Sequence, residues 1–216
     1  SAILLFLLIS IMVTGSRAGI VLTCLGFALA GLLLWREGVL ARLSRRVLLG
    51  GVVIGAAVVI AIAIQVAQLD RFKSEAVSND ARVLLLPEFA AMGERFFPVG
   101  SGFGSFDATY RALEKPGFLN DFYMNHAHND ILEIVIESGV FGGLLLLLAV
   151  LLYGVASWRV WRTPVRESMA IGLARLGAIF IAMILFHSFL DYPVRTPIVA
   201  VIVAISAFWL SVGAHR

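Results

Sequence analysis

His126-Ala127-His128-Asn129-Asp130-Ile131-Leu132-Glu133-Ile134-Val135-Ile136-Glu137-Ser138-Gly139 joins the only long polar segment of the chain to an apolar run of membrane length. This stretch places two histidines, an asparagine and three carboxylates where water should give way to lipid. A charged side chain near the bilayer core costs roughly 3 kcal/mol or more, so such groups are usually paired or functional. We therefore interpret the stretch as the mouth of a catalytic site.

The composition around this stretch is that of an integral membrane protein. The chain has 216 residues, of which 60% are hydrophobic, and this is too apolar for an ordinary soluble domain. The lone cysteine, Cys24, lies in an apolar run and is expected to be a small buried hydrophobe. No basic segment precedes the first apolar run, so a signal peptide is not expected. The first residue is Ser and the chain opens directly on apolar sequence, so we expect a fragment, the C-terminal part of a longer polytopic protein.

Apolar runs of sufficient length predict an all-α, polytopic transmembrane helix bundle, with residues 1–216 in one domain. A spanning helix needs about 20 predominantly apolar residues. On this basis we expect helices at about 2–15, 18–35, 47–67, 131–158, 168–190 and 197–214. The first is short, as a truncated helix would be.

The short connectors predict the orientation. Segments 36–46 and 159–166 are rich in arginine and are therefore expected on the cytoplasmic side. The spans between them then place Arg17, the loop 68–128 and the turn 191–197 together on the other face. The loop contains six Lys/Arg and eight Asp/Glu, so it has no excess of basic residues that would favour the cytoplasmic side.

The loop 68–128 is expected to be a partly helical extracytoplasmic cap rather than a linker, because it is long and aromatic. Val83–Leu86 and Phe89 would form one apolar helical face. Pro98–Gly104 is rich in glycine and predicts a turn.

The two histidines are candidates for acid–base chemistry. His126 and His128 are two residues apart, which separates them by about 200° on a helix and disfavours chelation of one metal. A neutral imidazole, with an ordinary pKa of about 6.5, can accept a proton from a hydroxyl near neutral pH. The alternative is that Asn129 or Asp130 caps the helix and the histidines have no catalytic role.

The carboxylates that follow suggest internal pairing. Asn129, Glu133 and Glu137 are four residues apart and share one helix face that should point into the protein. Glu137 could pair with Arg17 or Arg195, or orient a histidine. The alternative, a solvated first turn, suits Asp130 and Glu133 better than Glu137.

Arginines and a second polar turn complete the candidate set. Arg17 lies between two apolar runs. Its side chain should therefore be paired with an opposite charge, reach the membrane–water interface as a simple anchor, or face an anion such as phosphate. Arg82 alone would be called a surface charge. His187, Asp191 and Arg195 are four residues apart across a proline-containing turn and could support the site or anchor the turn.

These residues also resemble a known family. His126–Asp130 followed by Glu137–Gly142 resembles the signature of the bacterial O-antigen ligase/polymerase family. Ser16–Gly19 resembles its earlier arginine motif, and Asn79–Arg82 with Pro98–Gly104 resembles its outer loop. Asp191–Arg195 followed by Pro197 resembles a turn of exopolysaccharide-polymerase-like members. The four motifs occur in the family's order over nearly the whole chain, and members usually have about twice as many helices.

The resemblance implies a GT-C-like membrane glycosyltransferase of the bacterial inner membrane, with its site on the periplasmic or outer face. The donor would be a glycan on undecaprenyl diphosphate, and the acceptor a hydroxyl of lipid A–core or of another glycan. His128 would be the general base, with His126 as second choice, while Arg17 and Arg82 would bind the diphosphate. Asn129, Glu137, Asp191 and Arg195 would support them. No cofactor or metal is implied, and a chain-length regulator is a further partner of such enzymes.

A secondary transporter or flippase is the alternative, because intramembrane charges also suit transport. Transporters, however, tend to place binding residues near the bilayer midplane and to contain internal repeats, and neither pattern is evident here. Nucleic-acid binding is not expected, because the basic connectors are short and lack interleaved aromatic residues.

Overall fold

The computed structural model describes residues 6, 10, 11, 16–44, 50, 51, 55, 85–114, 124–164 and 168–215, apart from the side chains of Arg17 and Leu40. Every regular element within these residues is helical, which confirms the all-α class. The chain divides into two compact units, 1–79 and 80–216, which we describe separately.

The first unit contains α2 (Arg17–Arg36) and the short α3 (Val39–Arg42). Ser16 caps α2 by accepting the backbone N–H of Gly19 at 3.0 Å. Residues Ala18–Arg36 are long and apolar enough to cross a membrane. Cys24 is exposed on α2, so its expected burial was wrong: an apolar helix that can face lipid does not need to bury it in protein. The expected helix 47–67, and most of 2–15, lie outside the described residues.

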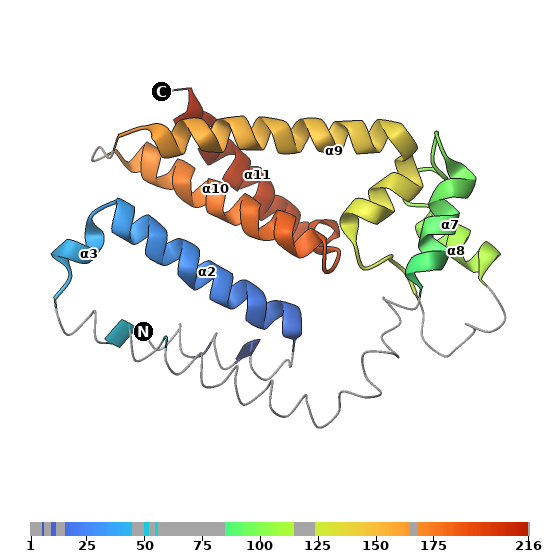
Figure 1. The fold of residues 1–216 in the computed structure, drawn as a ribbon, viewed down its shortest axis with the longest axis horizontal. Helices are drawn as coiled ribbons and strands as arrows, with labels where there is room; N and C mark the ends of the chain where they lie inside the picture. The colour runs from blue at the N-terminus through green and yellow to red at the C-terminus, as the bar shows by residue number, and fades with distance from the viewer. Residues whose placement is uncertain are drawn as a thin grey trace. The chain divides into compact units, whose positions relative to one another are not determined.

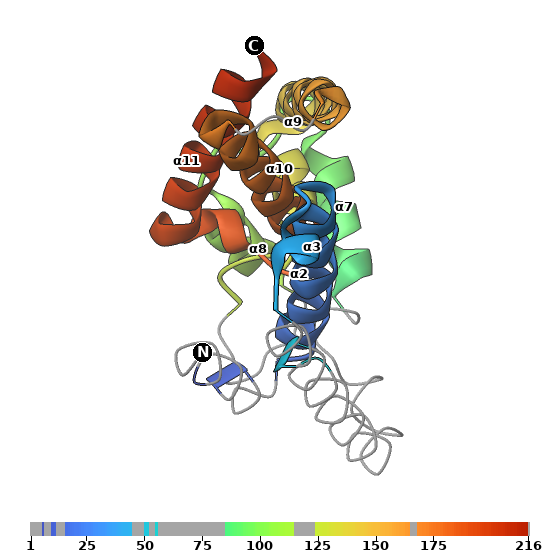
Figure 2. The ribbon, with the colours of Figure 1, turned by 90° about the vertical axis from the view of Figure 1, so that its left-hand side faces the viewer.

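Three helices of membrane-spanning length form the body of the second unit: α9 (Asp130–Arg162), α10 (Met169–Ser188) and α11 (Pro197–Ala214). They lie side by side in Figures 1 and 2. Their packed centre consists of Val160, Ala174, Ala178 and Leu210. A side chain at Gly177 would collide with the Ser206 carbonyl, so this glycine lets α10 and α11 approach closely.

Helix α9 bends sharply at Gly139, near its polar beginning (Figure 1). Gly139 has φ 58° and ψ −145°, a conformation that is essentially restricted to glycine. The bend divides α9 into a first part that carries three buried carboxylates and an apolar second part.

Helices α7 (Leu86–Phe96) and α8 (Phe106–Leu113) form a folded cap beside the bend. Phe89 is fully buried against Phe106 and Tyr110, with edge-on ring contacts at centroid distances of 5.4 and 5.7 Å. The same cluster includes Ala127 and Ile136. The cap is therefore packed directly onto the residues that precede and begin α9.

Candidate active site

The candidate site forms where the beginning of α9 meets the turn between α10 and α11. The backbone N–H of Asp130 donates to the Asp191 carbonyl at 3.3 Å, and the Asn129 amide donates to the Phe189 carbonyl at 3.2 Å. Asn129 also caps α9, because its side-chain oxygen accepts the Leu132 N–H at 3.0 Å. The turn continues through a short 3-10 helix, η2 (Pro193–Arg195). Segments about 60 residues apart in sequence are thus held together.

His128 occupies a strained backbone position in this junction. Its φ is 51°, in the left-handed region that few residues other than glycine adopt. Nδ1 of its ring lies 3.0 Å from Oδ1 of Asp191, and the ring packs edge-on against Tyr192 at 4.9 Å between centroids. Within the described residues, Nε2 of His128 has no hydrogen-bond partner. The arrangement orients the ring through one of its two nitrogens.

His126 is held by a different carboxylate. Its Nδ1 lies 2.8 Å from Oε1 of Glu133, while Oε2 of Glu133 accepts the Ala127 N–H at 2.8 Å. Tyr192 also packs against the His126 ring, at 4.4 Å between centroids. Spacing alone would place the two histidines apart, but both of their rings pack against the ring of Tyr192.

Arg195, whose side chain is 25% exposed, is the centre of an ion-pair cluster with three buried carboxylates. Its guanidinium lies 3.0 Å from Glu137, 3.2 Å from Glu133 and 3.7 Å from Asp130, measured between nitrogen and carboxylate oxygen. Asp130 also accepts from the Ser188 hydroxyl at 3.0 Å and the Val194 N–H at 3.2 Å. The expected pairing of Glu137 with an arginine is confirmed, with Arg195 as the partner.

The solvated first turn that we considered for Asp130 and Glu133 was wrong. Asp130 is 4% exposed and Glu133 is 0% exposed. The turn carrying Arg195 covers them, and its cation compensates their charge. The sequence did not lead us to expect that this turn covers Asp130 and Glu133, or that Tyr192 packs against both histidines. The sequence did contain an indication of this burial: carboxylates recur at positions 130, 133 and 137, a helical spacing that places them on one internal face.

The two arginines expected to bind diphosphate are not placed by the structure. Arg17 begins α2, but its side chain is outside the described set, and Arg82 lies outside the described residues. The described residues contain no group of three or more His, Cys, Asp or Glu side chains that could hold a metal ion. The role of Arg17 and Arg82 in binding the donor remains a prediction.

The fold and site together define a multi-pass membrane protein with histidine–carboxylate pairs at the polar end of a spanning helix. The family model described as O-Antigen ligase matches residues 2–147, and the chain belongs to this family. Membership indicates a glycosyltransferase-type enzyme that ligates or polymerises glycans at a membrane, with a lipid-linked glycan and a glycan acceptor as partners. Comparison with curated proteins and with solved structures found no match.

The match contains the 126–139 stretch but ends before the turn between α10 and α11. Asp191 and Arg195 are therefore connected to the site by the structure rather than by the family match.

Proposed function

We propose that this chain transfers a glycan from an undecaprenyl-diphosphate carrier to a sugar hydroxyl, with His128 as the general base. The observation that carries this proposal is the 3.0 Å contact between His128 Nδ1 and Asp191 Oδ1. Strained backbone at a ring held in this way is typical of functional positions, where the surrounding structure must compensate about 1–3 kcal/mol.

The reaction needs a base and a stabilised leaving group. The acceptor oxygen attacks the anomeric carbon of the donor sugar, and the bond from that carbon to the diphosphate oxygen breaks. The hydroxyl proton moves to Nε2 of His128, and Asp191 stabilises the resulting imidazolium through Nδ1–H. The departing diphosphate takes the electron pair of the broken bond, and Arg17 and Arg82 would balance its charge without a metal.

His126 is the second candidate for the base, and its surroundings favour a supporting role. Its carboxylate partner, Glu133, is fully buried and already shared with Arg195. The Arg195 guanidinium already compensates the charge of Glu133, so less of that charge is available to stabilise a His126 imidazolium. We therefore assign His126 and Glu133 to the positioning of the loop that carries His128.

The identity of the acceptor distinguishes two forms of the proposed activity. Transfer to lipid A–core would make the protein an O-antigen ligase, whereas transfer to another repeat unit would make it a polysaccharide polymerase. In either case we place the site on the periplasmic or outer face of the inner membrane, with the basic connectors 36–46 and 159–166 in the cytoplasm. This orientation rests on the distribution of arginine.

The test is a transfer assay with purified protein in membranes, in the presence of EDTA. The donor is an undecaprenyl-diphosphate-linked glycan, and lipid A–core or a second lipid-linked repeat unit is the acceptor. Asparagine tolerates a positive φ better than alanine, so His128→Asn is the variant that preserves the backbone. We expect it to reduce transfer by about 10²-fold or more, while His126→Asn retains more activity.

Each outcome of this assay has a defined meaning. Extended lipid-linked glycan indicates a polymerase, and labelled lipid A–core indicates a ligase. Transfer by His128→Asn at the wild-type rate contradicts the assignment of the base. Loss of transfer on addition of EDTA, restored by a divalent cation, contradicts the metal-free mechanism. Ion-driven uptake in proteoliposomes without transfer would instead favour a transporter.

A further inference from the structure

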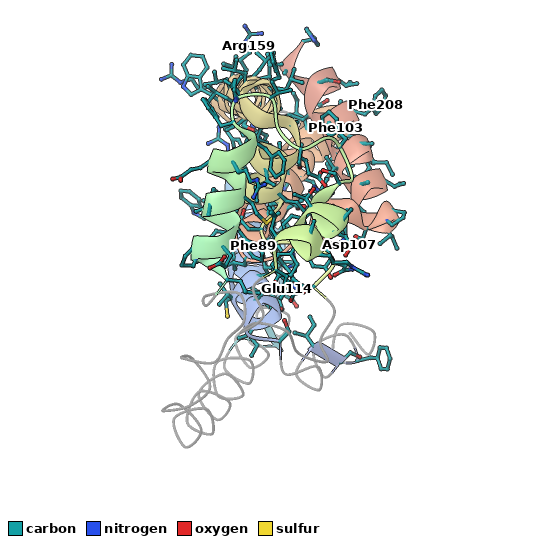
Figure 3. The ribbon with its side chains drawn as sticks, turned by 90° about the vertical axis from the view of Figure 1, so that its right-hand side faces the viewer. Phe89, Phe103, Asp107, Glu114, Arg159 and Phe208 are labelled. Atoms are coloured by element: carbon teal, nitrogen blue, oxygen red, sulfur yellow. The ribbon has the colours of Figure 1, made fainter. Side chains whose placement is uncertain are left out.

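The loop between α7 and α8 presents large apolar side chains without charged neighbours. No charged residue lies between Arg95 and Asp107. Phe97, Val99 and Phe103 are 65%, 67% and 80% exposed. Figure 3 labels Phe103 on this loop. Such a concentration of exposed apolar surface marks an interaction site rather than ordinary solvent-facing structure.

The base of the loop is hydrogen-bonded to the bend of α9. The bend at Gly139 disrupts the helical ladder, and the loop supplies replacement partners. Ser101 N–H donates to the Ile136 carbonyl at 3.0 Å, and Gly102 N–H donates to the Glu137 carbonyl at 2.8 Å. In return, the Pro98 carbonyl accepts the Val140 N–H at 2.9 Å. Loop and helix thus satisfy each other's backbone groups.

The polar side chains of the loop are also turned inward. The Ser101 hydroxyl donates to the Ile136 carbonyl at 3.3 Å, and the Ser105 hydroxyl lies 2.7 Å from that of Ser101. Irregular backbone is tolerated at membrane depth only where its polar groups find partners within the protein. The loop meets this condition at Pro98, Ser101 and Gly102, while its apolar side chains are exposed.

The apolar surface continues directly into the membrane span. Val140, which is bonded to the loop, is followed on α9 by the exposed residues Phe141, Leu144, Leu145 and Leu148. These belong to a helix long and apolar enough to cross a membrane. Charged residues lie instead on α7 and α8, at Glu88, Glu94, Arg95, Asp107 and Arg111.

We propose that the exposed side chains of Phe97, Val99 and Phe103 on this loop are inserted into the hydrocarbon of the bilayer, with lipid acyl chains as their partner. The cap formed by α7 and α8 is then anchored to the membrane at the level where α9 becomes apolar. Because Ile136 and Ala127 belong to the same packed cluster as the cap, the anchor also fixes the depth of the histidine-bearing segment. This inference depends on membership in a membrane-protein family and not on the chemistry assigned to His128.

Site-directed spin labelling tests the insertion. In a cysteine-free background, which within these 216 residues requires only Cys24→Ser, a single label is placed at Phe103→Cys. Leu145→Cys on α9 is the reference for lipid, and Ala108→Cys on the exposed side of α8 is the reference for water. The protein is reconstituted in phosphatidylglycerol–phosphatidylethanolamine vesicles, and collisions of each label with oxygen and with a neutral nickel chelate are measured.

The expected result is that the label at position 103 matches the one at position 145, with oxygen collisions exceeding nickel collisions, while position 108 shows the reverse. A nickel-dominated signal at position 103 overturns the proposal and places the loop in water. Low accessibility to both reagents also overturns it, because it indicates coverage by protein; spin–spin broadening would then identify a second copy. A label at Val99→Cys repeats the measurement if the Phe103 variant fails to fold.

Discussion

Arg195 and Glu137 form a 3.0 Å ion pair that links the turn after α10 to the bend of α9. Glu137 is only 3% exposed, and its other oxygen accepts the Phe106 N–H at the beginning of α8, at 3.1 Å. One carboxylate therefore joins the membrane bundle, the bend and the cap. Arg195 is also the cation that compensates the charge of three buried carboxylates.

Replacement of Arg195 by alanine should destabilise the protein strongly. Removal of one partner from a buried ion pair typically costs about 3–5 kcal/mol, because the opposite charge remains buried without compensation. Arg195→Lys should recover only part of this loss, since one ammonium cannot reproduce the planar fork that contacts Glu133 and Glu137 together. The measurement is the unfolding temperature of the purified protein in detergent.

The control is Arg111→Ala, which removes an exposed pair with Asp107 at 2.8 Å. An exposed pair contributes about 0–1 kcal/mol, so its unfolding temperature should change little. Similar shifts for Arg111→Ala and Arg195→Ala would show that the Arg195 cluster is solvated.

Asp191→Asn should slow glycan transfer while leaving the fold intact. The amide keeps the shape of the side chain but removes the charge that stabilises the His128 imidazolium and selects its tautomer. We expect kcat to fall by about 10²-fold or more, with little change in the KM for the donor. A role confined to anchoring the turn would lower the unfolding temperature and leave kcat of the folded fraction unchanged.

Much of the architecture could be predicted because membrane-spanning length and apolarity are local properties. Residues 197–214, expected as the last span, are α11 in the structure. The pairing of Glu137 with Arg195 could also be anticipated, since buried charges in a membrane protein require partners. Both arguments need only composition, spacing and the high free-energy cost of an unpaired charge.

The site itself depended on contacts that spacing does not encode. His128 meets Asp191 across 63 residues, and the positive φ at His128 changes the direction in which its ring points. Helical geometry would have separated His126 from His128, but the segment is not helical and Tyr192 packs against both. The bend at Gly139 was also missed, because its hydrogen-bond partners come from a loop about 40 residues earlier.

Tyr110 should make the stability of the protein sensitive to alkaline pH. Burial, followed by the nearby charge of Glu114, raises the pKa of Tyr110 to about 12. Because the pKa is lower in the unfolded chain, about 10, the unfolded state loses its proton first as pH rises. The stabilisation is complete below pH 10 and is lost between about pH 10 and 12, by on the order of 2 kcal/mol.

Tyr110→Phe removes this titration. Its unfolding free energy should be less dependent on pH over the same interval than that of the wild type, even if the lost hydroxyl makes it less stable at neutral pH. Denaturant unfolding at several pH values provides the measurement. Parallel pH profiles for the two proteins would contradict the assignment.

Gly139→Ala should disrupt the junction between α9 and the cap, whereas the same substitution at Gly154 should not. Alanine at position 139 would have to adopt φ 58° and ψ −145°, and its methyl group would collide with the Pro98 carbonyl. The strain alone costs about 1–3 kcal/mol, and relief by straightening the helix would break the hydrogen bonds to Ser101 and Gly102.

Gly154 lies on the same helix with nothing within 4 Å of its added methyl group, so alanine there should be neutral or stabilising by up to about 1 kcal/mol. Limited proteolysis between α7 and α8, together with unfolding temperature, distinguishes the variants: we expect faster cleavage and a lower unfolding temperature only for Gly139→Ala. Equal behaviour of the two would mean that the bend at Gly139 does not hold the cap in place.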